Sequence, residues 1–276
     1  SVDIIGPFGN ITNNKIYNNF LSGNSTNGIQ LSGITSTTVD TYFSSNNSIY
    51  NNQIIINDAI GIILTLQQNF NLIYDNNITI LNSSPPISAG NNFGINIRNG
   101  YNNTIYNNRI ISNHNGFGLT VREAWNNTFY NNYITSFEEG INLNGSIVSN
   151  YDEGSNNFFI NNTIITNKTS ISLTGNTTNN FFINTSFNKS QVLFIPRSPD
   201  NPVETNNITV QWYLQINVSN STGQPIPAQV IVNDSNTLNL LNETTTNGLT
   251  QTIIVTEYTQ NGSVNWSNLD SCSDIP

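Results

Sequence analysis

The sequence contains very few of the side chains from which proteins usually build catalytic or metal sites. Among its 276 residues there is one histidine, one cysteine and no methionine. The lone Cys272 excludes an internal disulfide and a cysteine-based metal cluster. The lone His114 excludes a His-based metal site and a catalytic triad. We therefore expect no metal, no other cofactor and no catalytic residue in this chain.

Charged side chains are equally scarce. They make up 8% of the residues, and the formal net charge is -9. Seven scattered basic residues form no patch for nucleic acid or anionic lipid, so we expect neither as a partner. The chain begins at Ser1 without an apolar leader and contains no membrane span, which predicts a processed mature form or a trimmed portion.

A nine-residue phrase is abundant instead. The phrase NNTIYNNRI, at 102–110, recurs seven times, and its copies begin at Asn13, Asn46, Phe70, Asn102, Asn126, Asn156 and Asn179. Asn occupies the second position in all seven copies and the seventh position in six, while the fourth and ninth positions are always large and apolar. A second phrase, Gly-apolar-x-apolar, follows five copies, as in GINI at Gly94.

This repeat predicts a solenoid. The fourth position recurs after 23 to 33 residues, and each unit holds short β-branched or aromatic runs between Asn and Gly corners. Such a unit cannot bury its own apolar face, so neighbouring units must stack. We predict an all-β fold: a right-handed parallel β-helix of about seven coils over 10–195. Asn repeated at one position in each coil favours a hydrogen-bonded side-chain ladder and sharp left-handed corners.

The repeated phrase resembles the parallel β-helix repeat family typified by the periplasmic copper-maturation protein NosD. The resemblance covers about two thirds of the chain and implies the fold, with archaeal relatives that are often large surface proteins. The resemblance says little about the activity of the protein, because the same repeat occurs in lyases, epimerases and structural proteins. The copper association does not carry over, since this chain has no Met and no usable His or Cys cluster.

Sequence triplets of the form Asn-x-Ser/Thr predict covalent N-linked glycans. Some of these triplets arise by chance in a chain rich in Asn, Ser and Thr, but several fall at fixed positions of the repeat, which favours carbohydrate on one face of several coils. The predicted glycosylation sites are Asn10, Asn24, Asn46, Asn77, Asn82, Asn102, Asn126, Asn144, Asn161, Asn167, Asn176, Asn184, Asn188, Asn207, Asn217, Asn220, Asn233, Asn242, Asn261 and Asn265.

The two ends of the chain suggest roles in assembly. Residues 1–9 (SVDIIGPFG) carry Val2, Ile4, Ile5 and Phe8, and form either a cap over the first coil or an arm that adds a strand to another subunit. Residues 196–204 are a Pro-rich linker. Residues 205–276 contain about five alternating strands, the last at SVNW, and resemble a carboxypeptidase-regulatory-like, Ig-like β-sandwich with a missing edge.

Only one weak group of residues suggests catalysis. The charged candidates on the coils are Arg98, Arg109, His114, Arg122, Glu123, Glu138, Glu139, Asp152 and Glu153. Arg122 and Glu123 follow one strand and Glu138 and Glu139 precede the next, so paired carboxylates within reach of each other would act on a glycan. The alternative is a solvated salt bridge between coils. Asp152 and Glu153 are the best candidates for a loop Ca²⁺ site.

Tyrosine recurs at the fifth position of the first five copies and predicts an aromatic column on the outer face. The residues are Tyr17, Tyr50, Tyr74, Tyr106 and Tyr130. The column would stack on sugars, stiffen the sheet or form an interface. Together these patterns favour a non-catalytic, N-glycosylated extracellular protein that polymerises into an archaeal cell-surface filament, pilus or coat. The alternatives are a polysaccharide lyase or hydrolase and a glycan-binding adhesin.

Overall fold

The computed structural model describes residues 1–5, 11–33, 44–81, 92–113, 116–145, 154–195, 204–235 and 238–264. Within these ranges nearly all regular structure is β-strand, apart from one short 3₁₀ helix, η1 (Lys189–Gln191). Two compact units are present: residues 1–208 with 260–276, and residues 209–259. We describe each by itself.

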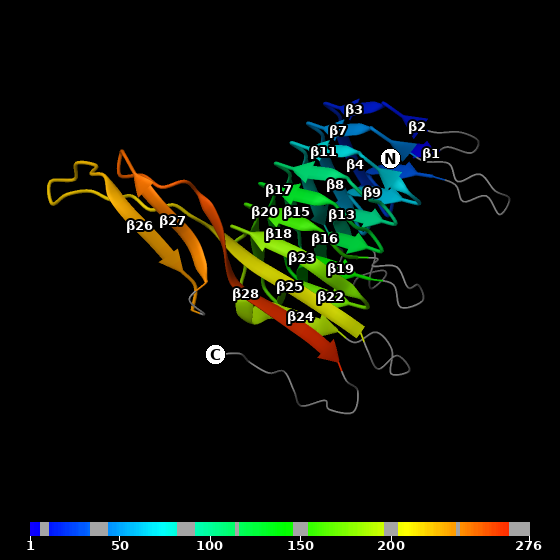
Figure 1. Ribbon diagram of the computed structural model, residues 1–276. Helices are drawn as coiled ribbons and strands as arrows, with labels where there is room; N and C mark the ends of the chain where they lie inside the picture. Colours follow the sequence, from blue (N-terminus) through cyan, green and yellow to red (C-terminus); the bar gives the residue numbers. More distant parts are fainter. Residues whose placement is uncertain are drawn as a thin grey trace. The chain divides into compact units, whose positions relative to one another are not determined.

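The first unit is the predicted right-handed parallel β-helix (Figure 1). Its eight-stranded sheet consists of β1 (Val2–Ile5), β5 (Ile29–Ser32), β9 (Ile62–Thr65), β13 (Phe93–Arg98), β16 (Phe117–Arg122), β19 (Glu139–Asn144), β22 (Thr169–Thr174) and β24 (Val192–Ile195). The neighbouring strands of this sheet pair in parallel, with Ile95 of β13 opposite Leu119 of β16 as an example.

Three further sheets complete the coils, and their coil strands pair in parallel. A six-stranded sheet holds β4 (Phe20–Asn24), β8 (Gln53–Asn57), β12 (Asn77–Leu81), β15 (Arg109–Ser112), β18 (Tyr133–Ser136) and β21 (Thr163–Thr166). A three-stranded sheet holds β2 (Ile11–Thr12), β6 (Ser44–Ser45) and β10 (Gln68–Asn69). The nine-stranded sheet begins with β3 (Lys15–Tyr17), β7 (Ser48–Tyr50), β11 (Leu72–Tyr74), β14 (Thr104–Tyr106), β17 (Thr128–Tyr130), β20 (Phe158–Ile160) and β23 (Thr177–Ile183).

Each of these seven strands of the nine-stranded sheet lies in one of the seven predicted coils. Their central residues, at the fourth position of the repeat, are all buried: Ile16, Ile49, Ile73, Ile105, Phe129, Phe159 and Phe182. The three phenylalanines stack inside the coils, with ring centroids 4.7 and 4.6 Å apart. Burial of one branched or aromatic side chain contributes roughly 1.5–3 kcal/mol, so this column and the ninth-position column hold the coils together.

The glycine of the second phrase is required by close packing. A Cβ on Gly118 would lie 2.3 Å from Ile134 Cγ2 and 2.6 Å from the carbonyl oxygen of Gly140 in the next coil. Gly61, Gly94 and Gly140 stand in the same relation to the next isoleucine and the next backbone carbonyl. The glycine column therefore lets the eight-stranded sheet approach the six-stranded sheet across the interior.

The N-terminal residues form part of this unit. β1 pairs in parallel with β5 of the same chain, Val2 opposite Ile29 and Ile4 opposite Leu31. In this structure the segment therefore lies as an edge strand on the first coil. The side chain of Ile5 and the whole of Phe8 lie outside the described residues, as does most of the predicted linker.

The chain enters and leaves the second unit through β25 (Glu204–Leu214) and β28 (Ile253–Val264), the last two strands of the nine-stranded sheet. The second unit also holds an antiparallel pair, β26 (Ala228–Asn233) and β27 (Asn239–Thr245). The prediction of a fifth strand at SVNW was wrong in its described part, because Ser263 and Val264 continue β28. The immunoglobulin-like assignment stays a prediction.

Candidate functional site

Two columns of buried asparagines run through the first unit. Each second-position Asn donates its backbone N–H and its side-chain Nδ2–H to the Oδ1 of the Asn one coil further on, from Asn14 through Asn47, Asn71, Asn103, Asn127 and Asn157 to Asn180. The seventh position repeats the arrangement from Asn19 to Asn162 and ends on the hydroxyl of Thr185. The predicted ladder is confirmed, and there are two of them.

The sharp corners lie one residue before each ladder position. Every first-position residue and every sixth-position residue has a positive φ near 55°, for instance Asn126 at 54° and Asn131 at 54°. Asn tolerates this left-handed conformation better than most residues. The sequence suggested one asparagine for both tasks, whereas the structure divides them between adjacent residues: the first turns the chain and the second bonds along the column.

No predicted glycosylation site is a residue of either ladder, and the two sets differ in exposure. Asn10, Asn82 and Asn265 lie outside the described residues, and each of the other seventeen predicted Asn residues is exposed or half-buried. By contrast, Asn47, Asn71, Asn103 and Asn127 are at most 1% exposed. A sugar can be attached only where the amide reaches solvent, so the geometry is compatible with modification at all seventeen.

The fifth-position tyrosines form the predicted outer column. Successive rings from Tyr17 to Tyr130 stack with centroids 4.7–4.9 Å apart and planes within 3°. Loss of hydration raises the pKa of Tyr74, Tyr106 and Tyr130, and neighbouring tyrosines and Asp75 add to the effect at Tyr74 and Tyr106. Because the ring faces cover one another, the column presents ring edges to solvent and is poorly suited to stacking on sugars. The open face belongs to the end ring, Tyr17, which is 48% exposed.

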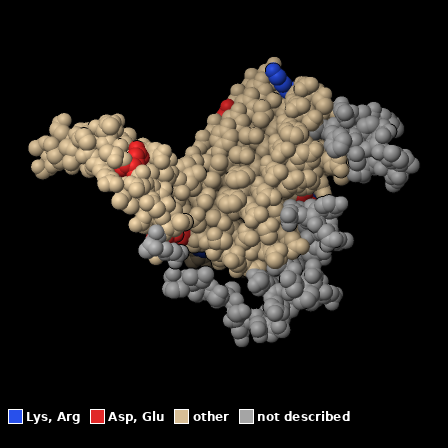
Figure 2. Space-filling view, in the orientation of Figure 1, with Lys and Arg blue, Asp and Glu red and all other residues tan. Residues whose placement is uncertain are grey.

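Charged atoms are sparse on the visible face of the described surface (Figure 2). The charged candidates on the coils do not gather. Glu139 lies opposite Phe117 at the start of its strand, whereas Arg122 lies opposite Asn144 at the other end. The five residue steps from Phe117 to Arg122 span about 17 Å at roughly 3.3 Å per residue. Glycosidase carboxylates lie roughly 5–10 Å apart. The predicted approach of the Arg122–Glu123 pair to Glu138 and Glu139 was therefore wrong.

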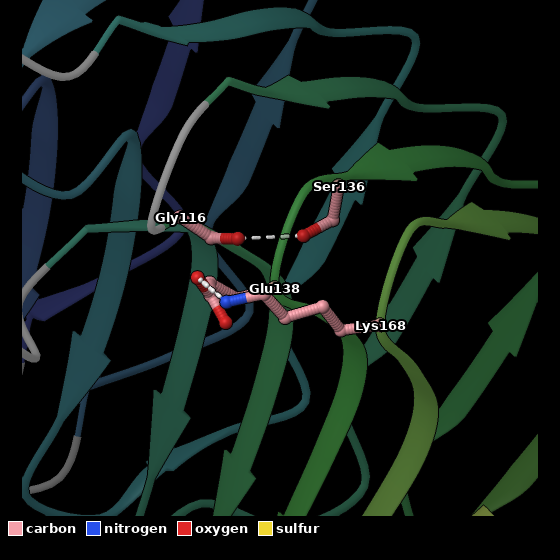
Figure 3. A network of polar contacts seen from close by, with 4 residues as sticks. All are labelled: Gly116, Ser136, Glu138 and Lys168. Atoms are coloured by element: carbon pink, nitrogen blue, oxygen red, sulfur yellow. Dashed lines mark hydrogen bonds and ion pairs between the residues drawn. The ribbon is translucent and has the colours of Figure 1, made fainter. Parts of the chain in front are cut away.

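Glu138 lies in a corner, where an ion pair and a backbone hydrogen bond engage it (Figure 3). Its carboxylate Oε1 accepts from Lys168 Nζ of the next coil at 2.5 Å, and its backbone N–H donates to the carbonyl of Gly116. Ser136 Oγ donates to the same Gly116 carbonyl at 2.6 Å. The side chains of Lys168 and Glu138 are 54% and 21% exposed, so this ion pair between coils contributes little.

The remaining charged candidates also have structural surroundings. Arg122 Nε lies 3.7 Å from Glu123 Oε1, and the Arg109 guanidinium lies 6.0 Å from the Tyr133 ring centroid. Arg98 is exposed at the end of β13. His114, Asp152 and Glu153 lie outside the described residues, as does Cys272. Within the described ranges no group of three or more His, Cys, Asp or Glu side chains could hold a metal ion.

The outer face of the eight-stranded sheet carries a row of polar side chains. Glu139 accepts hydrogen bonds from Asn142 Nδ2, at 3.0 Å, and from Ser172 Oγ. The rings of Phe93 and Phe117 lie beside the start of this row, with centroids 5.1 Å apart. Acids, amides and aromatic rings on one face are the groups that proteins use to bind sugars, although here the described carboxylate is already engaged by its neighbours.

The two ends of the ladders differ. At the first coil, no described group donates to Oδ1 of Asn14 or Asn19, and β2, β3 and β4 are outermost in their sheets. At the last coil, β25 continues the nine-stranded sheet next to β23, and its side chains bond residues that lie beside the columns: Asn206 Oδ1 accepts from Thr177, and Asn207 Oδ1 accepts from the Asn179 N–H at 2.7 Å. In the nine-stranded sheet the described strands thus continue past the last coil through β25, whereas β3 is outermost at the first coil.

The second unit has a small core. Val210, Val230 and Leu241 are buried, while six large apolar side chains are exposed, namely Tyr213, Ile226, Ile231, Leu238, Leu249 and Ile254. Trp212 Nε1 donates to Glu257, and Gln211 Nε2 donates to Thr256 across the β25–β28 pair. A two-stranded sheet such as β26–β27 is marginally stable without further packing.

Comparison with known proteins supports the fold. A family model described as "Periplasmic copper-binding protein (NosD)" matches residues 31–151, less than half of the chain and entirely within the β-helix. No curated protein matches this sequence. Among the described residues, no helix has the length and apolar character needed to cross a membrane.

The donor set of this chain does not fit a copper site of the kind that the family description implies. Proteins hold copper with imidazole, thiolate and thioether groups. The whole sequence offers one histidine and one cysteine and no methionine. We therefore derive no function through copper.

Three residues were not singled out from the sequence. Phe70, Tyr101 and Trp125 form an aromatic cluster at one corner of successive coils, with Tyr101 and Trp125 stacked 5.1 Å apart. The available signal was Phe70 itself, which occupies a position where every other copy of the repeat has Asn.

Proposed function

We propose that this chain is a non-catalytic, heavily N-glycosylated extracellular structural protein, a subunit of an archaeal cell-surface filament (pilus or thread) or coat. Its partners are other copies of itself, joined by strand exchange or end-to-end packing. The observation that carries the proposal is the asymmetry of the nine-stranded sheet, which continues into β25 after the last coil but ends at β3 at the first coil, beside the ladder ends Asn14 and Asn19. An uncovered sheet edge offers a template for another chain.

Carbohydrate would keep so weakly charged a surface hydrated. Charged residues are 8% of the chain, and the described surface carries seventeen accessible Asn-x-Ser/Thr sites. N-linked glycans at these sites would supply the hydration that charged side chains usually give. Such glycans would also favour a location outside the cell, since this modification belongs to exported proteins.

The second unit supports a role in joining subunits. Its six exposed apolar side chains and its two-stranded β26–β27 sheet leave apolar surface and backbone edges for an added strand. The apolar N-terminal segment with Val2 and Ile4 is the best donor, because it is an edge strand of the described structure and alternates apolar side chains.

The alternative function is glycan binding by an adhesin, or action on a polysaccharide as a lyase or hydrolase. The row formed by Glu139 and Asn142, beside Phe93 and Phe117, is the observation that favours it. Catalysis is less well supported, because Arg122 and Glu123 lie at the far end of the strands from Glu139.

Native material purified without heat or detergent tests the proposal by analytical ultracentrifugation and glycopeptide mass spectrometry. We expect polymers whose Asn-x-Ser/Thr sites carry sugar. A monomer that binds or cleaves a polysaccharide, with a loss on Glu139→Gln, would instead support the alternative. Unmodified asparagines at every site would remove the glycoprotein part of the proposal.

A further inference from the structure

The aromatic cluster of Phe70, Tyr101 and Trp125 occupies one corner of three successive coils, those of β11, β14 and β17. Tyr101 and Trp125 are bridged in parallel and their rings stack with planes 19° apart. The Phe70 ring meets the Tyr101 ring edge to face, with centroids 5.8 Å apart. In this cluster Tyr101 and Trp125 cover one face of each other, as the stacked tyrosines do, whereas the Phe70 ring is turned 79° from the Tyr101 ring and is 48% exposed, so Phe70 offers the open ring face.

Phe70 is the exceptional member of this cluster. It stands at the first position of its repeat with φ 56°, between Asn46 and Asn102 in the neighbouring coils. A bulky residue in the left-handed region is a genuine outlier, and strain of this kind persists where something requires the side chain. Packing of the interior is not the requirement, because Phe70 is 48% exposed.

Two predicted glycosylation sites adjoin the same rings. Asn102 directly follows Tyr101, and Asn126 directly follows Trp125. Asn102 and Phe70 lie in adjacent coils of the same column, separated by the roughly 4.8 Å spacing of paired strands. Asn102 is therefore flanked by Tyr101 in sequence, by Phe70 one coil before it, and by Trp125 one coil after it.

We propose that Phe70, Tyr101 and Trp125 form a platform on which the first sugars of an N-linked glycan at Asn102 pack. A pyranose ring presents a face of C–H groups, and an aromatic ring presents an apolar face with partial negative charge that attracts such groups. The platform converts one glycan from a mobile substituent into a packed part of the coil. This inference rests on the proposed glycosylation.

Two substitutions test the contribution of the sugar and the contribution of the Phe70 ring separately. Thr104→Val removes the glycosylation triplet of Asn102 while keeping a β-branched residue in β14 and the Asn at the corner. Phe70→Asn restores the residue found in the other copies of the repeat and creates no new triplet, because Leu72 follows two residues later. Thr163→Val removes the triplet of Asn161, which lies in a different corner, and is the matched control.

Thermal unfolding of native glycoprotein carrying these changes singly and together tests the proposal. We expect Thr104→Val to lower the melting temperature in the wild-type background and to have no effect in the Phe70→Asn background, while Thr163→Val acts equally in both. In protein stripped of sugar, Phe70→Asn should unfold at the same or a higher temperature, because it relieves backbone strain. Proton NMR of the glycan should show upfield ring-current shifts that Phe70→Asn abolishes.

Several results would overturn the proposal. Additive effects of Thr104→Val and Phe70→Asn would show that sugar and ring do not interact, and a lower melting temperature for sugar-free Phe70→Asn would assign the ring to packing alone. Binding of free oligosaccharides, lost on Phe70→Asn with additivity retained, would assign the platform to external sugars. An unmodified Asn102 among occupied sites would refute this inference only, whereas absence of sugar from every site would refute the glycosylation in the proposed function.

Discussion

The Oδ1 atom of Asn71 accepts two hydrogen bonds from Asn47, one from its backbone N–H at 2.9 Å and one from its Nδ2–H at 3.0 Å. Asn71 makes the same pair of bonds to Asn103 in the following coil. Each ladder residue therefore satisfies a backbone group as well as a side chain, and the coils stay in register even though the loops between them differ in length.

Removing one internal ladder residue should be costly. Asn71→Ala removes the Oδ1 acceptor that the backbone N–H and one Nδ2–H of Asn47 share. Each unsatisfied buried polar group costs about 1–3 kcal/mol, so we expect a loss of roughly 2–5 kcal/mol in the free energy of unfolding, measured by denaturant titration.

Asn14→Ala is the matched control for this experiment. Asn14 is the exposed first member of the same column, and no described group donates to its Oδ1. A loss of at most about 1 kcal/mol is expected there. Equal losses for the two variants would contradict a cooperative role for the ladder.

The glycine column gives a second prediction. Gly118→Ala places a methyl group 2.3 Å from Ile134 Cγ2 and 2.6 Å from the Gly140 carbonyl oxygen, and the backbone oxygen cannot rotate away. Overpacking of this kind costs on the order of 1–3 kcal/mol. Ser170→Ala in the corresponding position of β22 should cost less, because a Cβ is already accommodated there. Comparable losses in chemical denaturation would mean that the close approach is not the constraint.

Most of the β-helix could be predicted from the sequence, because strand positions in a solenoid repeat and each apolar position reports the same environment seven times. Ile73, Ile105 and Phe129 occupy one buried column as expected. The prediction that the charged candidates lie close together failed because Glu139 and Arg122, although on neighbouring strands, lie at opposite ends of those strands. The repeat indicates which residues of neighbouring coils lie side by side. A single sequence does not indicate as simply how far apart, along two strands, the remaining residues lie.

The second unit was predicted less well for a related reason. It has no repeat, and the boundary expected before SVNW, at Asn261 and Gly262, falls inside β28, whose residues from Gln260 onward belong to the first unit. Asn and Gly usually indicate a turn, but here they extend a long edge strand. The aromatic platform was likewise not predicted, since in the sequence Phe70 is only an irregular residue at the first position of its repeat. Its neighbours in the adjacent coils become known only from the structure.

Alkaline pH should destabilise the second unit through Tyr258. Burial, with a smaller effect of Glu257, raises the pKa of Tyr258 from 10.0 to about 12. Because the folded state holds this proton more tightly than the unfolded state, the stability it contributes is complete below about pH 10 and is lost as the pH rises towards 12.

Circular dichroism at increasing pH measures this loss. Tyr258→Phe should remove part of the decline in stability above pH 10, and Tyr213→Phe serves as the matched tyrosine deletion from the same unit. If the two variants follow the same curve, or if wild-type stability is flat across this range, burial of Tyr258 does not govern the alkaline limit.

Copper should neither bind nor stabilise the protein. One histidine, one cysteine and no methionine leave too few soft donors for a specific site. We expect native material to contain no stoichiometric copper by elemental analysis, and added copper to leave the melting temperature unchanged. A saturable rise in melting temperature with one equivalent would contradict this reading of the donor set.

Electron cryo-microscopy of the unheated, detergent-free native material tests assembly most directly. We predict fibres in which a neighbouring subunit lies against the open first coil, next to β3 and β4, with backbone density continuing the columns that end at Asn14 and Asn19. Dispersed single rods, with this end facing solvent, would contradict the structural role.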